Sequence, residues 1–242
     1  MDENTLLARR QFLKQSAAAG LISLGTPTAW TDSVYAMGKI PRKLNPPKSI
    51  YELKGRVLVN GQLANARSVI SANSTVETGS NSFVVFVVGA GAHILRENSK
   101  VSFTGSEFLE QGLRLLTGKL MSVFGHRDTA RDRLKMHTTT ATIGIHGTGV
   151  YAESYADRSY VCTCYGSTRI ASSDTPAEFE DVTTTHHDAP RFILANPEAG
   201  KLILPAPVFN HTDEELMIAE AIVGRRPPFS SINDYNQSII DY

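Results

Sequence analysis

Short apolar stretches separated by turn residues recur about every ten residues through the first two thirds of this chain. They lie at residues 56–59, 82–88, 93–95, 100–103, 113–116, 119–123, 141–145 and 160–164. No helical segment is expected between them. Strands at this spacing are typical of all-β folds. The pattern therefore predicts an all-β module over residues 51–170, built as an antiparallel β-sandwich or roll or as a solenoid-like stack.

The N-terminal 36 residues have the pattern of a leader. The run Ala8-Arg9-Arg10-Gln11-Phe12-Leu13-Lys14 precedes an apolar stretch at residues 17–24. This arrangement resembles a twin-arginine export signal, although Ala8 stands where that signal prefers Ser or Thr. Val34-Tyr35-Ala36 supplies the compact residues of a cleavage site, so we expect residues 1–36 to be removed. The resemblance implies that the protein folds before export and is periplasmic.

Composition excludes two classes of partner. The 24 acidic residues balance the 24 basic residues, and the basic residues form no stripe. Nucleic acid is therefore not an expected partner, because binding it requires neutralising phosphates. Outside the signal, no apolar run approaches the roughly 18 residues of a membrane span.

Residues 37–50 are rich in Pro and Lys and are predicted to be an extended linker.

Four runs stand out within the β-rich part. They are Gly55-x-Val57-x-Val59-Asn60-Gly61, Val76-Glu77-Thr78-Gly79-x-x-Ser82, Leu116-Thr117-Gly118-Lys119-Leu120 and Thr140-x-Thr142-Ile143-Gly144-Ile145-His146-Gly147-Thr148. Together they resemble the FecR domain, a periplasmic signalling family. His146 departs from the family, which usually carries Arg there. The resemblance implies a β-rich binding domain. Regulatory members add an anti-sigma segment and a membrane span, which we do not find, so no anti-sigma activity is expected.

The C-terminal extension, residues 171–242, is predicted to be mostly loop with one helix over residues 213–223. Thr212 and Glu215 have the spacing of a capping box, and Gly224 is a natural helix stop. The apolar face of this helix consists of Leu216, Ala219, Ile222 and Val223. The helix is expected to pack on the β module as a lid or brace.

Two cysteines and three histidines carry donor atoms suited to a transition metal. They are Cys162, Cys164, His186, His187 and His211. Thiolates and imidazoles suit zinc, copper or iron. Residues i and i+2 of a strand face the same side, so both cysteines can reach one ion. A loop histidine and the histidine before the helix would complete the set.

The same pattern predicts how the donors are arranged. Consecutive residues of an extended segment alternate in direction, so only one of His186 and His187 is expected to face the site. Asp188 is expected to orient a ligand histidine. Asp213 and Glu214 are expected to offset the positive end of the helix dipole.

Three interpretations of these residues stay open: a metal or haem site, a structural role without metal, and a redox-active dithiol. The spacing matches no standard zinc finger, and the Cys-x-x-Cys-His run of covalent haem attachment does not occur. A strand separates the two cysteine Cα atoms by about 6.5–7 Å, at the upper limit for a disulfide. The remaining histidines are predicted to be strand or turn residues; they are His93, His126, His137 and His146.

No catalytic motif accompanies these residues. Gly-x-Ser-x-Gly, His-Glu-x-x-His and phosphate-loop runs do not occur, so the sequence favours a binding module over an enzyme. We expect an exported FecR-like binding and signalling module with a periplasmic protein partner and a metal at the Cys-x-Cys and histidine group. The alternatives are a periplasmic redox metalloprotein and a structural envelope protein stapled by a metal.

Overall fold

The computed structural model of the protein describes residues 41–106, 109–125 and 134–231. The predicted export signal and His126 lie outside these residues. The described residues fold into β-strands with one α-helix. In chain order they are β1 (Ile50–Lys54), β2 (Val57–Val59), β3 (Gln62–Leu63), β4 (Thr75–Thr78), β5 (Phe83–Val88), β6 (Gly91–Leu95), β7 (Lys100–Ser106), β8 (Leu109–Val123), β9 (Leu134–His137), β10 (Ala141–Ile145), β11 (Gly149–Ser154), β12 (Arg158–Ser172), β13 (Phe179–Thr184), β14 (Arg191–Glu198), β15 (Lys201–Pro205), α3 (Asp213–Ile222) and the short 3₁₀ helix η2 (Pro228–Ser231).

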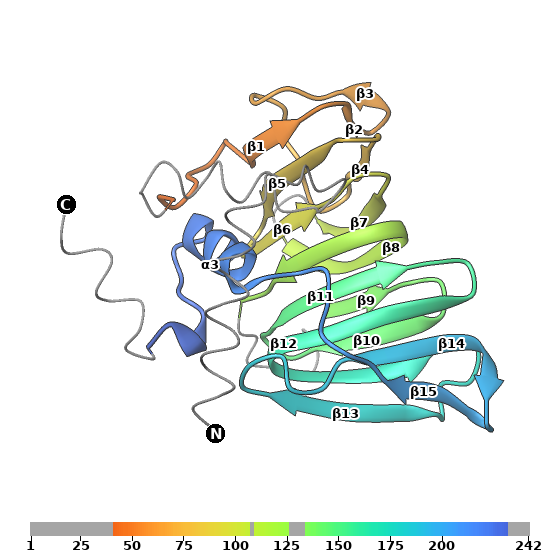
Figure 1. Cartoon of the computed structure of the whole chain (residues 1–242). Helices are drawn as coiled ribbons and strands as arrows, with labels where there is room; N and C mark the ends of the chain where they lie inside the picture. Colours follow the sequence, from red (N-terminus) through yellow and green to blue (C-terminus); the bar gives the residue numbers. More distant parts are fainter. Residues whose placement is uncertain (1–40, 107–108, 126–133, 232–242) are drawn as a thin grey trace, which may run out of the picture. The chain divides into compact units, whose positions relative to one another are not determined.

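The strands form two sheets that share two long strands. The first sheet has the order β1-β5-β6-β8-β11-β12-β14-β15. The second has the order β3-β2-β4-β7-β8-β9-β10-β12-β13. Figure 1 shows the strands following one another in colour order, from β1–β3 at one end to β13–β15 at the other. The all-β prediction is therefore confirmed.

The shared strands β8 and β12 change sheets at glycines. Gly118 has a φ of +86° and Gly166 a φ of +85°, in the left-handed region that favours glycine. The part of β8 before Gly118 pairs with β7 and the part after it with β6. The parts of β12 on either side of Gly166 pair with β11 and β10 in the same way. These corners allow one strand to serve both sheets.

Alternation along the strands sorts side chains between the main core and the opposite face of the first sheet. Val150 and Ala152 of β11 and Val161 of β12 belong to the main core. Tyr151, Cys162 and Cys164 stand at the intervening positions and are also fully buried. The first sheet is therefore buried on both faces in this region.

Helix α3 contacts β6 and β8 and supplies part of that outer cover. Glu215 accepts a hydrogen bond from the Thr212 backbone N–H at 2.9 Å, which is one half of the predicted capping box. Leu216, Ala219 and Ile222 are buried, as the predicted apolar face requires. The helix ends before Gly224, which has a φ of +77°. The helix predicted over residues 213–223 is observed over Asp213–Ile222, and Val223 of the predicted apolar face is only half-buried.

The extension differs from the predicted loop. It contributes β13, β14 and β15, and β12 continues through residue 170 to Ser172. Strand β13 was missed because it is an edge strand of mostly polar residues in which Val182 is the one buried apolar side chain. Cross-strand polar pairs such as Arg169–Asp181, 2.7 Å apart, accompany it.

Two further details complete the comparison with the sequence. The Asn60-Gly61 turn joins β2 to β3 as a hairpin, with φ values of 52° and 79°. The β8–β9 pair is parallel rather than antiparallel. The reason is that β8 ends in the first sheet, and the chain re-enters the second sheet beside the start of β8. Among the described residues, no helix is long and apolar enough to cross a membrane.

Candidate metal centre

Strand β12 presents the two cysteines side by side beneath the outer cover of the first sheet. Both are buried and neither forms a disulfide. Cys162 lies opposite Tyr151 of β11 in the antiparallel register. The Cys164 thiol lies 3.7 Å from the Cys162 carbonyl oxygen. Both cysteines lie in β12 at positions i and i+2, so their side chains are on the same side of the strand, as predicted.

The loop after β13 brings His187 over this pair. The Asp188 carboxylate accepts hydrogen bonds from the backbone N–H groups of Thr185 at 3.0 Å and His186 at 3.3 Å, which shapes the turn. His187 has a φ of +54°, an unusual conformation for a residue other than glycine. Its backbone N–H donates to the Cys164 carbonyl at 2.9 Å. The loop is thus fixed directly to the cysteine strand.

His211 approaches from the segment that precedes α3. Its Nδ1 lies 2.7 Å from the Phe209 carbonyl oxygen. Its ring stacks on Tyr151, with centroids 4.5 Å apart and planes 17° apart. Tyr160 lies against Phe209, with ring centroids 4.3 Å apart, and donates to the Pro207 carbonyl at 3.0 Å. This aromatic wall fixes the direction of the His211 ring.

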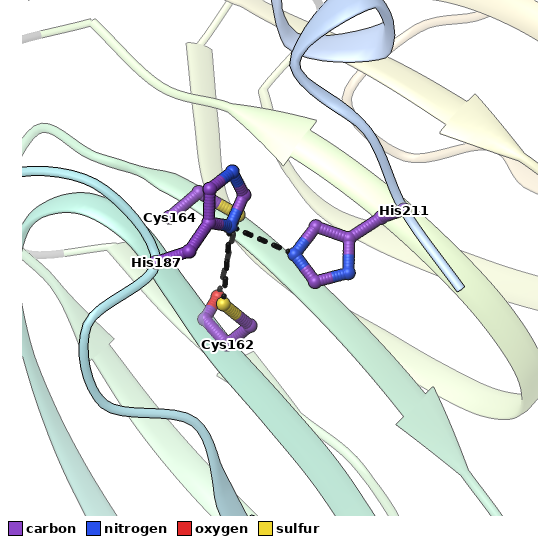
Figure 2. A group of neighbouring side chains, drawn as sticks. All are labelled: Cys162, Cys164, His187 and His211. Carbon is purple, nitrogen blue, oxygen red and sulfur yellow. Dashed lines mark hydrogen bonds between the residues drawn. The ribbon is translucent and has the colours of Figure 1, made fainter. Parts of the chain in front are cut away.

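The four side chains converge, as Figure 2 shows. His187 Nδ1 lies 3.5 Å from Cys162 Sγ and 2.9 Å from His211 Nε2. One donor atom from each of Cys162, Cys164, His187 and His211 lies within 4.8 Å of the other three. Three segments far apart in sequence therefore meet at one small group of N and S atoms.

The outer hydrogen bonds of both rings determine what faces this group. A carbonyl can only accept, so His211 Nδ1 carries a proton and its Nε2 presents a lone pair. His187 Nε2 lies 3.1 Å from the Asp213 carboxylate, which makes Nε2 the donor and leaves a lone pair on Nδ1. Two lone pairs then face each other at 2.9 Å beside a thiol. A further proton or a metal cation must lie between them.

The pKa shifts describe the protonated, metal-free form of the group. Hydrogen bonding by Cys164, and then by His187 and His211, lowers the pKa of the Cys162 thiol against the opposing effect of burial. Burial, followed by the neighbouring Cys162 thiolate, raises the pKa of Cys164. Burial lowers the pKa of His187, but the hydrogen bonds and charges of Cys162 and Asp213 outweigh it and raise this pKa overall. In the metal-free group these shifts favour a thiolate at Cys162 and a proton on His187, and they oppose ionisation of Cys164.

The donor set fits a tetrahedral metal ion. Zinc binds imidazole nitrogen at about 2.0–2.1 Å and thiolate at about 2.3 Å, so tetrahedral ligands lie about 3.3–3.8 Å apart. The 3.5 Å between His187 Nδ1 and Cys162 Sγ lies in this range, and the 2.9 Å between His187 Nδ1 and His211 Nε2 is shorter than it. Two thiolates would neutralise a divalent ion in this buried setting. The Asp213 carboxylate behind His187 is the second partner that metal-bound histidines usually have.

Four of the five predicted ligands therefore meet, and His186 faces elsewhere. Its Nε2 lies 2.8 and 3.0 Å from the two Asp213 carboxylate oxygens. The expectation that only one of the two adjacent histidines faces the cysteines matches this geometry. Asp188 does not have the role predicted for it, because its carboxylate holds the backbone of the turn and Asp213 contacts the rings.

Sequence reasoning missed two residues of the site. Tyr151 supports His211 by stacking, and its own hydroxyl donates to the buried Glu153 at 2.6 Å. Asp213 was noted for its charge, but its contact with His187 depends on where α3 begins relative to the loop. The nearest sequence signal was the acidic first turn of the helix directly after His211.

Comparisons with known proteins leave the function open. No protein-family model matches the chain, and no curated protein matches it. Two crystal structures of a proposed anti-sigma factor from Parabacteroides distasonis, at 1.65 and 2.50 Å resolution, each align with a TM-score of 0.44 and 12% identity. Each alignment covers 55% of this chain and 58% of the other. Function must therefore be inferred from the side-chain geometry of this chain.

Proposed function

We propose that this chain is an exported binding and signalling module of the periplasm, stapled by one transition-metal ion, zinc foremost, at Cys162, Cys164, His187 and His211. One observation carries the metal assignment. The inward nitrogens of His187 and His211, each with its outer nitrogen donating to an acceptor, lie 2.9 Å apart beside buried thiols. A metal cation satisfies both lone pairs and both thiolates at once.

The environment favours a structural ion over a catalytic one. Catalytic zinc sites keep an open position for water, whereas four protein ligands close the coordination sphere. Cys162 and Cys164 are fully buried and His211 is 9% exposed, so little room remains for a substrate. The ion would join β12, the loop after β13 and the segment before α3.

Export and partner binding are supported by the sequence. The twin-arginine-like run supports export of a protein that has already folded. The FecR-like runs support a binding role, and sheet edges such as β13 and β15 offer sites for strand addition by a protein partner. A periplasmic redox metalloprotein is the second candidate, because two soft thiolates and two imidazoles also suit copper.

Metal analysis of the purified protein tests this proposal. We expect about one zinc per chain, no visible colour, and release of about two protons per ion on reloading, from Cys164 and the Cys162–His187 pair. A coloured, redox-active protein would support the copper alternative instead. A protein that binds no transition metal would overturn the metal assignment.

The matching variant is Cys162→Ser combined with Cys164→Ser. We expect loss of the metal and a melting temperature about 10 °C lower, because metal binding adds several kcal/mol to folding at such sites. A chelator should remove most of this difference by lowering the wild type. Thr163→Ser, which alters the other side of the same strand and keeps the hydroxyl, should retain the metal. Equal melting of wild type and double variant would contradict the staple.

A further inference from the structure

The thiols of the proposed metal centre are buried, which raises the question of how a metal ion reaches them. Cys162 and Cys164 are fully buried, and the side chain of His187 is 11% exposed. An ion from solution therefore cannot meet the thiolates directly. The more exposed donor groups beside His187 are His186 and Asp213, which we call the rim of the site.

A second group of donor atoms stands at this rim. His186 Nε2 lies 2.8 Å from Asp213 Oδ1, and His187 Nε2 lies 3.1 Å from the same oxygen. The His186 side chain is 45% exposed and the Asp213 side chain 30% exposed. These three side chains hold their donor atoms within 4.8 Å of one another. The rim group thus combines two imidazoles and a carboxylate at the solvent boundary.

His187 belongs to both groups through its two ring nitrogens. Nδ1 faces Cys162 and His211, whereas Nε2 faces Asp213. The left-handed backbone at His187 allows two consecutive histidines to reach the same carboxylate. His186 otherwise contacts the ring of Phe229, with centroids 4.7 Å apart. An exposed His–Asp pair of this kind contributes little to stability.

We infer that His186, Asp213 and the outer nitrogen of His187 form a second, exchangeable metal site that captures the ion and loads the buried centre. This inference rests on the proposed metal centre. Imidazole nitrogens with one carboxylate select Zn²⁺, Cu²⁺ or Ni²⁺ over Ca²⁺ and Mg²⁺, which take oxygen ligands. Three ligands and solvent exposure leave positions for water, so an ion held there exchanges readily. Capture displaces the proton on His187 Nε2, and that nitrogen takes a proton back when the ion moves inward to Nδ1 and to Cys162, Cys164 and His211.

Loading kinetics with Co²⁺ test the inference, because cobalt bound to thiolates absorbs light and so reports on the buried centre alone. Metal-free wild type, His186→Ala and His146→Ala would each be mixed with one equivalent of Co²⁺. His146 is an exposed histidine outside both groups and serves as the matched control. We expect His186→Ala to load at least about tenfold more slowly, as expected when a capture site is lost. Its final absorbance and its dissociation constant at the buried centre should equal those of wild type.

The outcomes separate this inference from the proposal beneath it. If the thiolate–cobalt band forms at the wild-type rate in His186→Ala, the rim site is not the loading route, and the buried centre stands. If His146→Ala is slowed as much as His186→Ala, the effect is not specific and the inference also fails. If no band forms in wild type, the buried centre itself is wrong and the loading role is lost with it.

Discussion

The histidines of this chain differ in their contacts and in their pKa because they lie in different surroundings. His187 and His211 each have an acceptor on one nitrogen and a converging group on the other. His93 is a strand residue, as the sequence predicts, but it is fully buried in β6 among Phe86, Phe103 and Phe124. Burial lowers its pKa to about 3. Burial therefore opposes protonation of the His93 ring in the folded state, although the buried Glu110 carboxylate lies 3.7 Å from its Nε2.

This burial predicts an acid-sensitive contribution to stability. The unfolded chain protonates His93 below pH 6.5, whereas the folded chain does so only near pH 3. Stability from this residue is therefore present above pH 6.5 and declines as the pH falls, by about 2 kcal/mol between pH 7 and pH 5. His93→Gln removes the titration, although Gln is itself less stable there. Urea unfolding in the presence of a chelator measures the free energy of unfolding of both proteins. The difference between wild type and His93→Gln should narrow by about 2 kcal/mol between pH 7 and pH 5.

The control for this experiment is His146→Gln, at an exposed position. Its gap to wild type should stay constant over the same pH interval. A gap for His93→Gln that is equally constant would mean that the folded state protonates His93 as readily as the unfolded state does, despite burial. The chelator keeps metal release from the Cys162 group out of the comparison.

Among the strands, the bend of β8 at Gly118 gives the sharpest prediction. A Cβ at this position would lie 2.1 Å from Ser99 Oγ, and the φ of +86° is unfavourable for alanine. Ser99 Oγ accepts the Lys119 backbone N–H at 2.9 Å, so the serine cannot move aside without losing that bond. We expect Gly118→Ala to reduce the free energy of unfolding by about 3 kcal/mol, from backbone strain and overpacking together.

Gly61→Ala is the matched control for backbone strain alone. Gly61 has a similar φ of +79°, but a Cβ there meets nothing within 4 Å. Its loss should be about 1 kcal/mol. Urea unfolding measures both variants. Equal losses at Gly61 and Gly118 would show that β8 does not need the close approach to Ser99 in order to turn between the sheets.

The helices and strands also show how much of the fold could be predicted from the sequence. Periodicity and turn chemistry were enough for the hairpin at residues 60–61, the buried strand β5 and the helix α3. Strand β13 was missed because its alternating positions carry mostly Thr and charged residues in place of apolar ones, and local sequence rules assign such residues to loops. The convergence of Cys162, Cys164, His187 and His211 was predictable only in part, because Cys-x-Cys on a strand places both thiols on one side but does not position the histidines. The role of Asp213 was not predictable, because it depends on how the loop and the helix meet.

At the scale of the whole molecule, the proposed metal centre joins the two ends of a long segment of the chain. The chain leaves β12 after Ser172, forms β13–β15 and returns to the same place through His211. Helix α3 follows and has anchors of its own, because Arg96 pairs with the buried Glu215 and Tyr165 donates to Glu220. The metal should therefore restrain the loop and the segment before the helix more than α3 itself.

Hydrogen exchange with and without a chelator measures this restraint. We expect amides of residues 185–188 and 209–212 to exchange at least about tenfold faster without metal, corresponding to about 1.4 kcal/mol of lost local stability. The His187 amide, which donates to Cys164 across the centre, is the most direct reporter. Amides of β4 and β5, which lie far along the two sheets, should change much less. Equal acceleration everywhere would mean that the ion stabilises the unit only globally, and unchanged exchange at residues 185–188 would mean that it does not staple the loop.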